Sequence, residues 1–525
     1  GASGAQLSAL FIAAGRARPE PVRTVDGVHA AERLADYDHA TVWRARFHLP
    51  ADRPSSYQWS GESYDVAGDL RGDMRIAYVS CNGEEIGDLE REGSERNAMW
   101  ARLREDHRSA PFSLLLHGGD QVYADDPSPE ILDRLRARRG AGHGPDSVRG
   151  TDAEDEICDF EEYSWLYHES WGAEPVRKLL ASVPSCMILD DHDLRDDWNS
   201  SASWRANIET RSWWKDRVVG AFTSYWVYQH LGNLSPAELV EDELYAAVRS
   251  AASDTERERV LASFSLRIDA EPSTGRWSFY RDFGDTRLIM IDSRCARNLD
   301  PNNRAMVDAR QWAWVRERAL EASPKHLLFG SSLPYLMLPA LHHLEQWNEA
   351  VAQGSWGRAA ARVGEKLRID LDLEHWAAFG NSFADMATLT RELARGEDAP
   401  ASILWLSGDV HCSYVARAEF GVGGDVPATY QLTMSPFRNP LELPIRAVNR
   451  LAIKRPMARA MAALARSANV APTETSWKTE AGPWFDNGVM LLTTDGDSAA
   501  LRVEHAFVNA AGVQTLTTTC EIRLT

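Results

Sequence analysis

Four separate segments of this 525-residue chain run from an apolar, strand-like stretch directly into side chains that bind metal ions. The stretches and the residues that follow them are 74–80 with Cys81, 113–117 with Asp120, 186–189 with Asp191, and 403–407 with Asp409. Parallel strands deliver their carboxyl ends to one crevice, which is where ligands bind in open α/β sheets. We therefore expect residues that are far apart in the sequence to converge on a single metal site.

Strand-like and helical stretches alternate through most of the chain. Apolar residues recur at three-to-four spacing in 94–104, 164–180, 211–231, 304–322 and 342–365, and further strand-like runs cover 276–283, 288–291, 326–329 and 430–434. This alternation predicts a layered α/β fold. Three runs near the end of the chain, 489–494, 499–508 and 514–524, predict an antiparallel closing unit.

The N-terminal part of the chain differs from the rest. Residues 1–72 contain short β-like runs separated by proline-containing turns, so we expect a small β appendage there. Residues 73–525 would form one large domain with helical insertions at about 198–260 and 341–395. Such insertions either form the walls of a substrate pocket or pack outside the core. The first is rich in tryptophan, which we expect to supply buried area rather than to stack on a ligand.

The charge and the cysteine content exclude several classes of protein. A formal net charge of -20 argues against a specific nucleic-acid binder, because an acidic surface repels polyphosphates. An anionic substrate would need a focused positive site, which bound cations supply. Six widely spaced cysteines do not indicate a disulfide framework. No apolar run reaches the roughly 20 residues that span a bilayer, so we expect a soluble protein, either cytoplasmic or exported with a leader already removed.

The residue types in the four segments are those of a site that holds two metal ions. Asp120 follows two glycines, which allow close backbone approach, so its carboxylate is placed to bridge both ions. Cys81, Tyr123 and His411 would give one ion a mixed thiolate, phenolate and imidazole shell, which suits a transition metal and ferric iron in particular.

The second ion would have a shell of carboxylate oxygens. Asp191 and Asp409, with Asp120 shared, favour a hard cation such as Ca²⁺, Mg²⁺ or Mn²⁺. His192 directly follows one of these candidate ligands, so we expect it to act on the reacting group rather than to be a surface histidine. Asp190 and Asp193 are candidates for orienting their two neighbours.

The segments 80–82, 117–123, 190–193 and 407–414 together resemble the signature blocks of the PhoD-like (alkaline phosphatase D) family of metallophosphoesterases. The blocks occur in the correct order over roughly residues 74 to 440. The resemblance implies an α/β, four-layer sandwich in which two mixed β-sheets are flanked by helices. It also implies that residues 73–525 form a catalytic domain that hydrolyses phosphate esters by a metal-activated hydroxide.

The resemblance further implies the ligands of each metal. Fe³⁺ would be bound by Cys81, Asp120, Tyr123 and His411, and Ca²⁺ by Asp120, Asp191 and Asp409, with Mg²⁺, Mn²⁺ or Zn²⁺ as alternatives for the second ion. His192 corresponds to the histidine that assists departure of the leaving oxygen. The superfamily usually supplies one more histidine to the second metal, from a block between 192 and 409, and the sequence does not identify it.

Arg294 follows another apolar run and has two possible roles. Its planar guanidinium could clamp a substrate phosphate, or it could pair with Asp292 or another neighbouring acid. The sequence favours neither interpretation.

We therefore expect a phosphoesterase that acts on a small-molecule phosphate ester, as a phosphomonoesterase or phosphodiesterase. One alternative is a phospholipase D-like phosphodiesterase that acts on lipid head groups. Another is a non-catalytic binding protein that is stabilised by metal ions.

The stretch 443–466 contains six basic residues and no acidic one, with apolar residues at helical spacing around Pro456. It could make weak contact with a membrane surface, or it could pack on the acidic body of its own protein. The sequence favours the second interpretation, because internal charge complementarity requires no partner.

Overall fold

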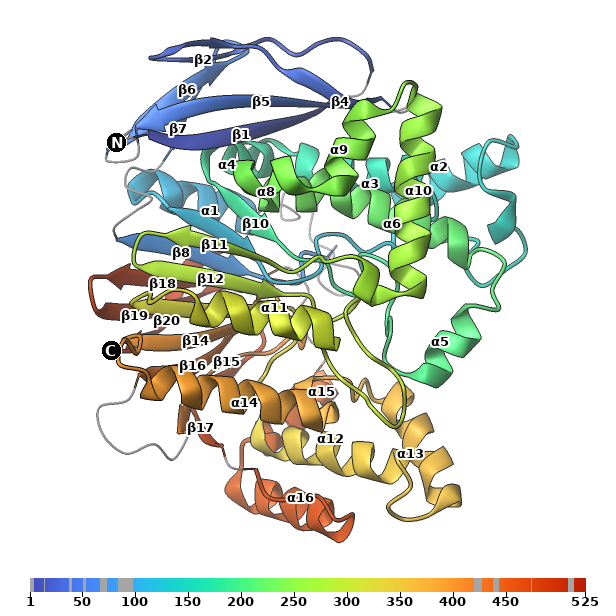
Figure 1. Ribbon diagram of the computed structural model, residues 1–525, viewed down its shortest axis with the longest axis vertical. Coiled ribbons are helices and arrows are strands. Elements are labelled where there is room, and N and C mark those ends of the chain that lie inside the picture. The colour runs from blue at the N-terminus through green and yellow to red at the C-terminus, as the bar shows by residue number, and fades with distance from the viewer. Residues whose placement is uncertain are drawn as a thin grey trace.

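Two small antiparallel sheets form the N-terminal part of the protein. The computed structural model describes residues 4–13, 15–36, 40–50, 53–66, 73–83, 98–419, 427–437, 443–473, 475–508 and 514–525. One sheet has the order β1-β5-β4 and the other β3-β2-β6-β7. The bounds are β1 Gly4–Ala13, β2 Val22–Thr24, β3 Gly27–His29, β4 Glu32–Asp36, β5 Thr41–Pro50, β6 Ser55–Trp59 and β7 Glu62–Val66. Figure 1 shows both sheets at one end of the molecule. An apolar cluster that includes Phe47 and Tyr57 holds them together.

The remaining strands form two larger mixed sheets. The first has the order β10-β9-β8-β18-β19-β20 and the second β11-β12-β13-β14-β16-β15-β17. In the first sheet β8, β9 and β10 are parallel, and in the second β12, β13, β14 and β16 are parallel.

The strands of the first sheet are β8 Met74–Val79, β9 Leu114–His117, β10 Ser185–Met187, β18 Gly488–Asp495, β19 Ser498–Val508 and β20 Gln514–Arg523. Those of the second are β11 Phe279–Phe283, β12 Thr286–Ile291, β13 His326–Ser331, β14 Ser402–Ser407, β15 Ser413–Glu419, β16 Ala428–Thr433 and β17 Ser476–Trp484. The C-terminal strands β18, β19 and β20 pair antiparallel, as the sequence predicts.

The two large sheets pack against each other, and helices cover their outer faces. Side chains alternate between the faces of a strand, so Ile76 and Tyr78 of β8 share a cluster with Leu404 of β14, while Ala77 and Val79 point the other way. The outer face of the first sheet packs on α1 and α4, and that of the second on α11 and α14. These helices span Ala98–Ser109, Glu174–Ser182, Ala309–Leu320 and Gly380–Arg395. The mixed α/β class is therefore confirmed.

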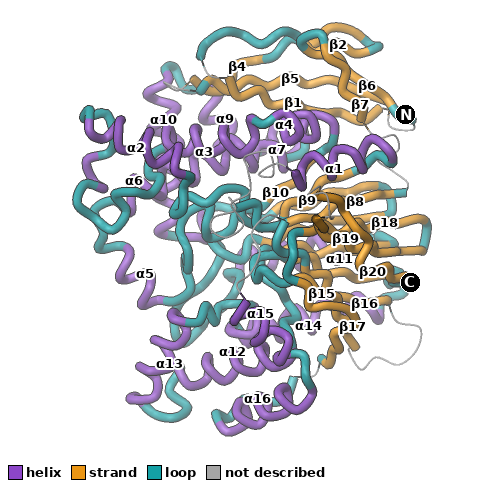
Figure 2. The backbone as a smooth tube through the Cα atoms, turned by 180° about the vertical axis from the view of Figure 1, so that it is seen from behind, coloured by secondary structure: helices purple, strands orange, loops and turns teal. Residues whose placement is uncertain are grey.

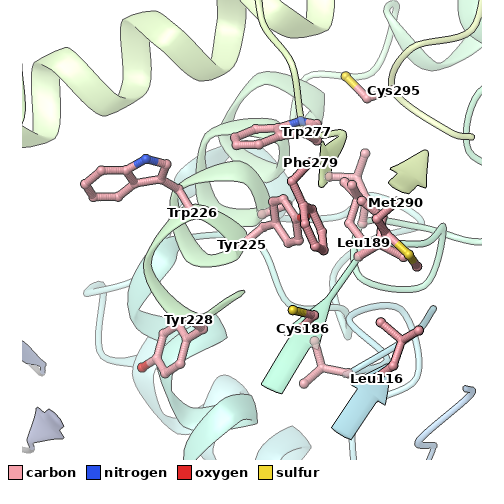
Figure 3. Close-up of a cluster of buried hydrophobic side chains, with 14 of the residues drawn as sticks. Leu116, Cys186, Leu189, Tyr225, Trp226, Tyr228, Trp277, Phe279, Met290 and Cys295 are labelled. Atoms are coloured by element: carbon pink, nitrogen blue, oxygen red, sulfur yellow. The ribbon is translucent and has the colours of Figure 1, made fainter. Parts of the chain in front are cut away.

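The segment between β10 and β11 is the tryptophan-rich insertion. Its helices are α5 Ala202–Ile208, α6 Trp214–Tyr225, the π-helix η2 Trp226–His230, α7 Leu231–Asn233, α8 Pro236–Glu241, α9 Glu243–Ser250, α10 Asp254–Ala270 and the short η3 Pro272–Thr274. Trp198, Trp213 and Trp226 are fully buried. Figure 3 shows Trp226 and Trp277 among the apolar side chains of the core. These tryptophans supply buried area, as expected.

Several predicted helices are divided in the structure. The run 164–180 lies across α3 (Phe160–Gly172) and α4, and the run 342–365 lies across α12 (Pro339–Ala352) and α13 (Arg358–Asp370). Gly354 and Gly357 have positive φ between α12 and α13, which ends the first helix although the apolar spacing continues.

Other boundaries differ by a few residues. The run 443–466 forms α15 (Leu443–Ala452) and α16 (Arg455–Ser467), with Pro456 in the first turn of α16. The predicted strand 276–283 begins only at Phe279. Residues 94–97 of the predicted helix 94–104 lie outside the described residues. The remaining helical elements are α2 Pro129–Gly140, η1 Asp146–Val148 and η4 Trp376–Ala378.

The cysteines and the lengths of the helices bear on two further expectations. All six cysteines are free, so there is no disulfide framework. Within the described residues, no helix is both long enough and apolar enough to cross a bilayer.

Candidate metal centre

Four carboxylates from both large sheets gather where the parallel strands end. Asp120 follows β9, Asp190 and Asp191 follow β10, and Asp409 follows β14. Each of the four offers one oxygen, and these oxygens lie within 4.8 Å of one another. The predicted convergence of these strand ends is therefore confirmed. Figure 2 shows loops, rather than helices, at this edge of the strands.

Two glycines allow the strand ends to approach one another this closely. A Cβ at Gly408 would lie 1.9 Å from Ser80 Oγ, and one at Gly119 would lie 2.8 Å from a carboxylate oxygen of Asp190. Any larger residue would push the loops apart. Gly118 is also packed closely, since a Cβ there would lie 2.3 Å from the Tyr78 hydroxyl, so both glycines before Asp120 are explained by close packing.

Cys81 and His411 are held next to the carboxylates by one hydroxyl group. Ser435 Oγ lies 3.0 Å from Cys81 Sγ and accepts a hydrogen bond of 3.0 Å from the His411 amide. Cys81, His411 and Asp409 all have positive φ, which is uncommon for residues other than glycine and is found where surrounding contacts enforce it. Burial, with the Asp120 and Asp409 carboxylates, raises the pKa of the Cys81 thiol well above its usual value.

Tyr123 returns to the same site, as the sequence predicts. Its hydroxyl donates a hydrogen bond of 3.2 Å to Asp120, and its ring stacks on His192 with 4.4 Å between ring centroids. His192 is fixed from the other side by Asp125, whose carboxylate lies 2.9 Å from Nδ1. The phenol, the imidazole and the bridging candidate therefore form one contiguous group.

The electrostatic surroundings favour a protonated His192. Burial opposes the charged imidazolium, but Asp125, Asp191 and Asp120 outweigh it and raise the pKa of His192 well above its ordinary value. Burial likewise opposes ionisation of Asp125, yet His192 and the Asp196 amide hold the pKa of Asp125 below its usual range. The pair is thus a carboxylate that orients a cationic imidazole.

Asp193 connects the two acidic loops. Its carboxylate accepts hydrogen bonds from the backbone amides of Gln121 and Val122, at 3.2 and 3.3 Å, and from the amide of Asp190 at 3.1 Å. The side chain thus ties the loop of Asp120 to that of Asp191, through backbone amides rather than through the side chains of Asp191 and His192.

Arg294 lies inside the acidic cluster and has no exposed surface. Its guanidinium contacts Asp190 and Glu374, and one terminal nitrogen lies 3.0 Å from Asp191 and 3.2 Å from Asp409. Of the two roles considered for Arg294, the structure shows the ion pair with neighbouring acids rather than a free guanidinium that faces a substrate site. The partners are more distant in the sequence than Asp292, which accepts only a backbone hydrogen bond from Arg294.

A histidine that the sequence did not reveal lies beside Asp409. His375 Nδ1 is 2.7 Å from Glu345 of α12, and its Nε2 is 3.7 Å from Asp409 and has no hydrogen-bond partner. The residue is 8% exposed. This imidazole nitrogen lies beside one of the four clustered carboxylates and could itself hold a metal ion. His375 occupies the chain interval in which an additional histidine ligand was expected.

The donor atoms fit a cation. The buried oxygens Asp120 Oδ1 and Asp190 Oδ2 have no hydrogen-bond partner. Burial and the nearby Asp190 carboxylate raise the pKa of both Asp120 and Asp409 well above the usual range, because several negative charges share one water-poor space. A bound cation would relieve this repulsion, so the cluster could hold a metal ion.

Sequence reasoning missed three polar residues that support the site: Asp125, Glu374 and Ser435. Asp125 belongs to an acidic pair just after Tyr123, which was an available signal. Glu374 precedes His375 in an acidic-histidine pair within the predicted insertion 341–395, a weaker signal. Ser435 follows a strand and has no distinguishing pattern.

Comparisons with known proteins identify the fold and the family. No curated protein matches the sequence. A solved structure, described as the structure of PhoD, aligns with a TM-score of 0.53 at 9% sequence identity and covers 97% of this chain and 86% of that one, which shows a similar fold. The family model of the PhoD-like phosphatases matches residues 76–428. Since that match covers more than half of the sequence, the chain belongs to the PhoD-like phosphatase family.

Proposed function

We propose that this protein hydrolyses phosphate esters at the carboxylate cluster formed by Asp120, Asp190, Asp191 and Asp409. Membership of the PhoD-like phosphatases supports a phosphoesterase function. The observation that carries the proposal is that one oxygen of each of these four acids lies within 4.8 Å of the others, and that buried oxygens of Asp120 and Asp190 have no hydrogen-bond partner. His192 lies beside this cluster, with its ring on Tyr123. An acidic protein binds phosphate esters only where cations reverse the local field.

The donor set supports two kinds of metal ion. Cys81, Tyr123 and His411 would hold Fe³⁺ together with Asp120, and Asp191, Asp409 and Asp120 would hold Ca²⁺ or else Mg²⁺, Mn²⁺ or Zn²⁺. We add His375 to the second group. Bound metal ions would supply Lewis-acid activation of the phosphoryl group and of water.

The protein's own residues would position the substrate and move a proton. His192 carries the proton that stabilises the leaving oxygen, and Asp125 holds its ring in place. Tyr123 limits the movement of that ring by stacking on it. Arg294, which has no exposed surface, would act as a positioning residue that keeps Asp190, Asp191 and Asp409 together rather than as a phosphate clamp.

The same proposal includes the architecture of the catalytic part. The order of helices, sheet, sheet and helices over residues 73–525 supports a four-layer metallophosphoesterase sandwich. Residues 1–72 would be a small β appendage, because their described strands pair only with one another, although Leu34 and Val42 pack into the core of the larger part.

The test is hydrolysis of nitrophenyl phosphate and of bis-nitrophenyl phosphate, with iron and calcium present, from neutral to alkaline pH. We expect Asp120→Asn to abolish turnover and to lower the metal content of the purified protein. Asp36→Asn is the matched control, since Asp36 is buried in the N-terminal β part, where it pairs with Arg33. Full activity in Asp120→Asn would remove this cluster from consideration.

The same measurement separates the alternatives. Faster monoester cleavage would identify a phosphomonoesterase, and faster diester cleavage a phosphodiesterase, including the phospholipase D-like type. No turnover of mono-, di- or triesters with metals restored would favour a non-catalytic, metal-stabilised binding protein. A visible charge-transfer absorption that is lost in Tyr123→Phe would show that ferric iron is bound by the Tyr123 phenol. An active enzyme without this absorption would exclude ferric iron bound by that phenol.

A further inference from the structure

The helices α15 and α16 expose an unusual number of large apolar side chains. Of the thirteen such side chains exposed among the described residues, five lie between positions 443 and 457. They are Leu443 at 76%, Ile445 at 47%, Val448 at 54%, Leu451 at 53% and Met457 at 39% exposure. Single exposed apolar residues are ordinary on protein surfaces, but a contiguous group indicates a contact surface.

The helical geometry of α15 places three of these residues on one side. Ile445, Val448 and Leu451 follow one another at three-residue spacing, so their side chains adjoin along the helix. Asn449 and Ala452, which are buried, follow Ile445 and Val448 by four positions and so form the edge of this side where the helix meets the protein. The outward side of α15 is therefore apolar, although nothing in the described residues covers it.

Exposed positive charges surround this apolar side. Arg450, Lys454, Arg455, Arg459 and Arg466 are all exposed. None of these five makes an ion pair with another residue that the structure describes, whereas Arg446 lies 3.4 Å from Asp486. Both helices pack on the body of their own protein, as the sequence favoured, but among the described residues only Arg446 of the six basic residues pairs with an acid.

The inward side of the same helices is attached to the candidate metal centre. Ala452 and, from α16, Ala458 and Met461 pack in one cluster with Val410 and Cys412, which flank His411. α16 also packs along α12, whose Glu345 contacts His375. Both ribbon views place α15 and α16 at the end of the molecule opposite the N-terminal sheets (Figure 1, Figure 2).

We infer that α15 and α16 dock the protein onto a membrane surface that contains anionic phospholipid. An apolar face flanked by Lys and Arg suits the boundary between acyl chains and negatively charged head groups. A second copy of this chain fits less well, because the same basic segments would face each other and repel. The inference does not depend on the proposed function.

The experiment is co-sedimentation of the full-length protein with vesicles of phosphatidylcholine alone and of phosphatidylcholine mixed with phosphatidylserine. We expect binding to the anionic vesicles only, weakened by salt. Each Lys or Arg near such a surface contributes about fivefold to binding, so Arg450→Ala/Arg455→Ala/Arg459→Ala should weaken it about 100-fold. Val448→Ser/Leu451→Ser should weaken it about tenfold or more without changing the net charge.

The control changes three exposed cations elsewhere, Arg108→Ala/Arg211→Ala/Lys215→Ala, which should leave binding as in the parent. Circular dichroism and thermal melting establish that each variant is folded. The inference is overturned if the parent protein does not bind anionic vesicles, or if the two sets of cation substitutions weaken binding equally. It is also overturned if sedimentation velocity shows a dimer that Val448→Ser/Leu451→Ser dissociates while vesicle binding is absent. The vesicle assay does not depend on substrate hydrolysis, so its result holds even if the protein has no phosphoesterase activity.

Discussion

Substitution of Arg294 by glutamine tests how the acidic cluster is held together. The guanidinium has no exposed surface and contacts Asp190, Asp191, Asp409 and Glu374. Removing one partner of a buried ion pair costs about 3–5 kcal/mol, because the remaining charge stays buried without compensation. Unfolding of a unit of several hundred residues has an entropy near 1 kcal/mol/K, so the melting temperature in a chelator should fall by about 3–5 °C.

Calcium should reverse much of this loss. A divalent cation supplies positive charge among the same carboxylates, so saturating calcium should raise the melting temperature of Arg294→Gln more than that of the parent protein. Arg217→Gln is the control, since Arg217 is equally buried but pairs with Glu156. It should lower the melting temperature, yet its response to calcium should equal that of the parent.

Scanning calorimetry in chelator and in calcium gives both quantities. An Arg294→Gln variant that melts with the parent in chelator would refute the structural role. If that variant also showed a reduced kcat/KM with unchanged stability, the guanidinium would be a phosphate clamp after all.

Two further predictions concern His375 and the pH dependence of stability. Glu345→Gln should weaken calcium binding by about 10-fold to 100-fold, measured from the calcium dependence of the melting temperature, because Glu345 orients His375 from 2.7 Å; an unchanged titration would exclude His375 as a ligand. His230 is buried against Tyr225 and Trp277, and burial lowers its pKa from 6.5 to about 3. Below pH 6.5 the His230 imidazole is protonated in the unfolded chain but stays neutral in the folded protein until about pH 3. This residue should therefore lower the free energy of unfolding progressively as the pH falls from 6.5 toward 3. Between neutral pH and pH ~5, the free energy of unfolding of His230→Phe, measured in urea, should fall by up to about 2 kcal/mol less than that of the parent. Equal decreases in the two proteins would contradict the assigned pKa.

Local patterns were sufficient for the strands and for the loops that carry the carboxylates. The strands β8, β9, β10 and β14 are short apolar runs because both faces of each sheet are covered, and such runs are visible without a structure. The polar residues that follow them converge because parallel strands end at one edge. The helix ends were less accessible, since the apolar spacing of 342–365 continues through the break at Gly354 and Gly357.

The sequence by itself determined the fold class, the candidate ligands that follow the strands, and the basic character of residues 443–466. Only the tertiary structure decided which side chains face one another. It placed Arg294 among carboxylates, brought His375 from an insertion to Asp409, and paired Arg446 of α15 with Asp486. The physical reason is that these contacts join residues 34 to 115 positions apart, as for His375 with Asp409 and Arg294 with Asp409. Periodicity and motif spacing report only on neighbours along the chain, whereas such contacts depend on how sheets and helices pack.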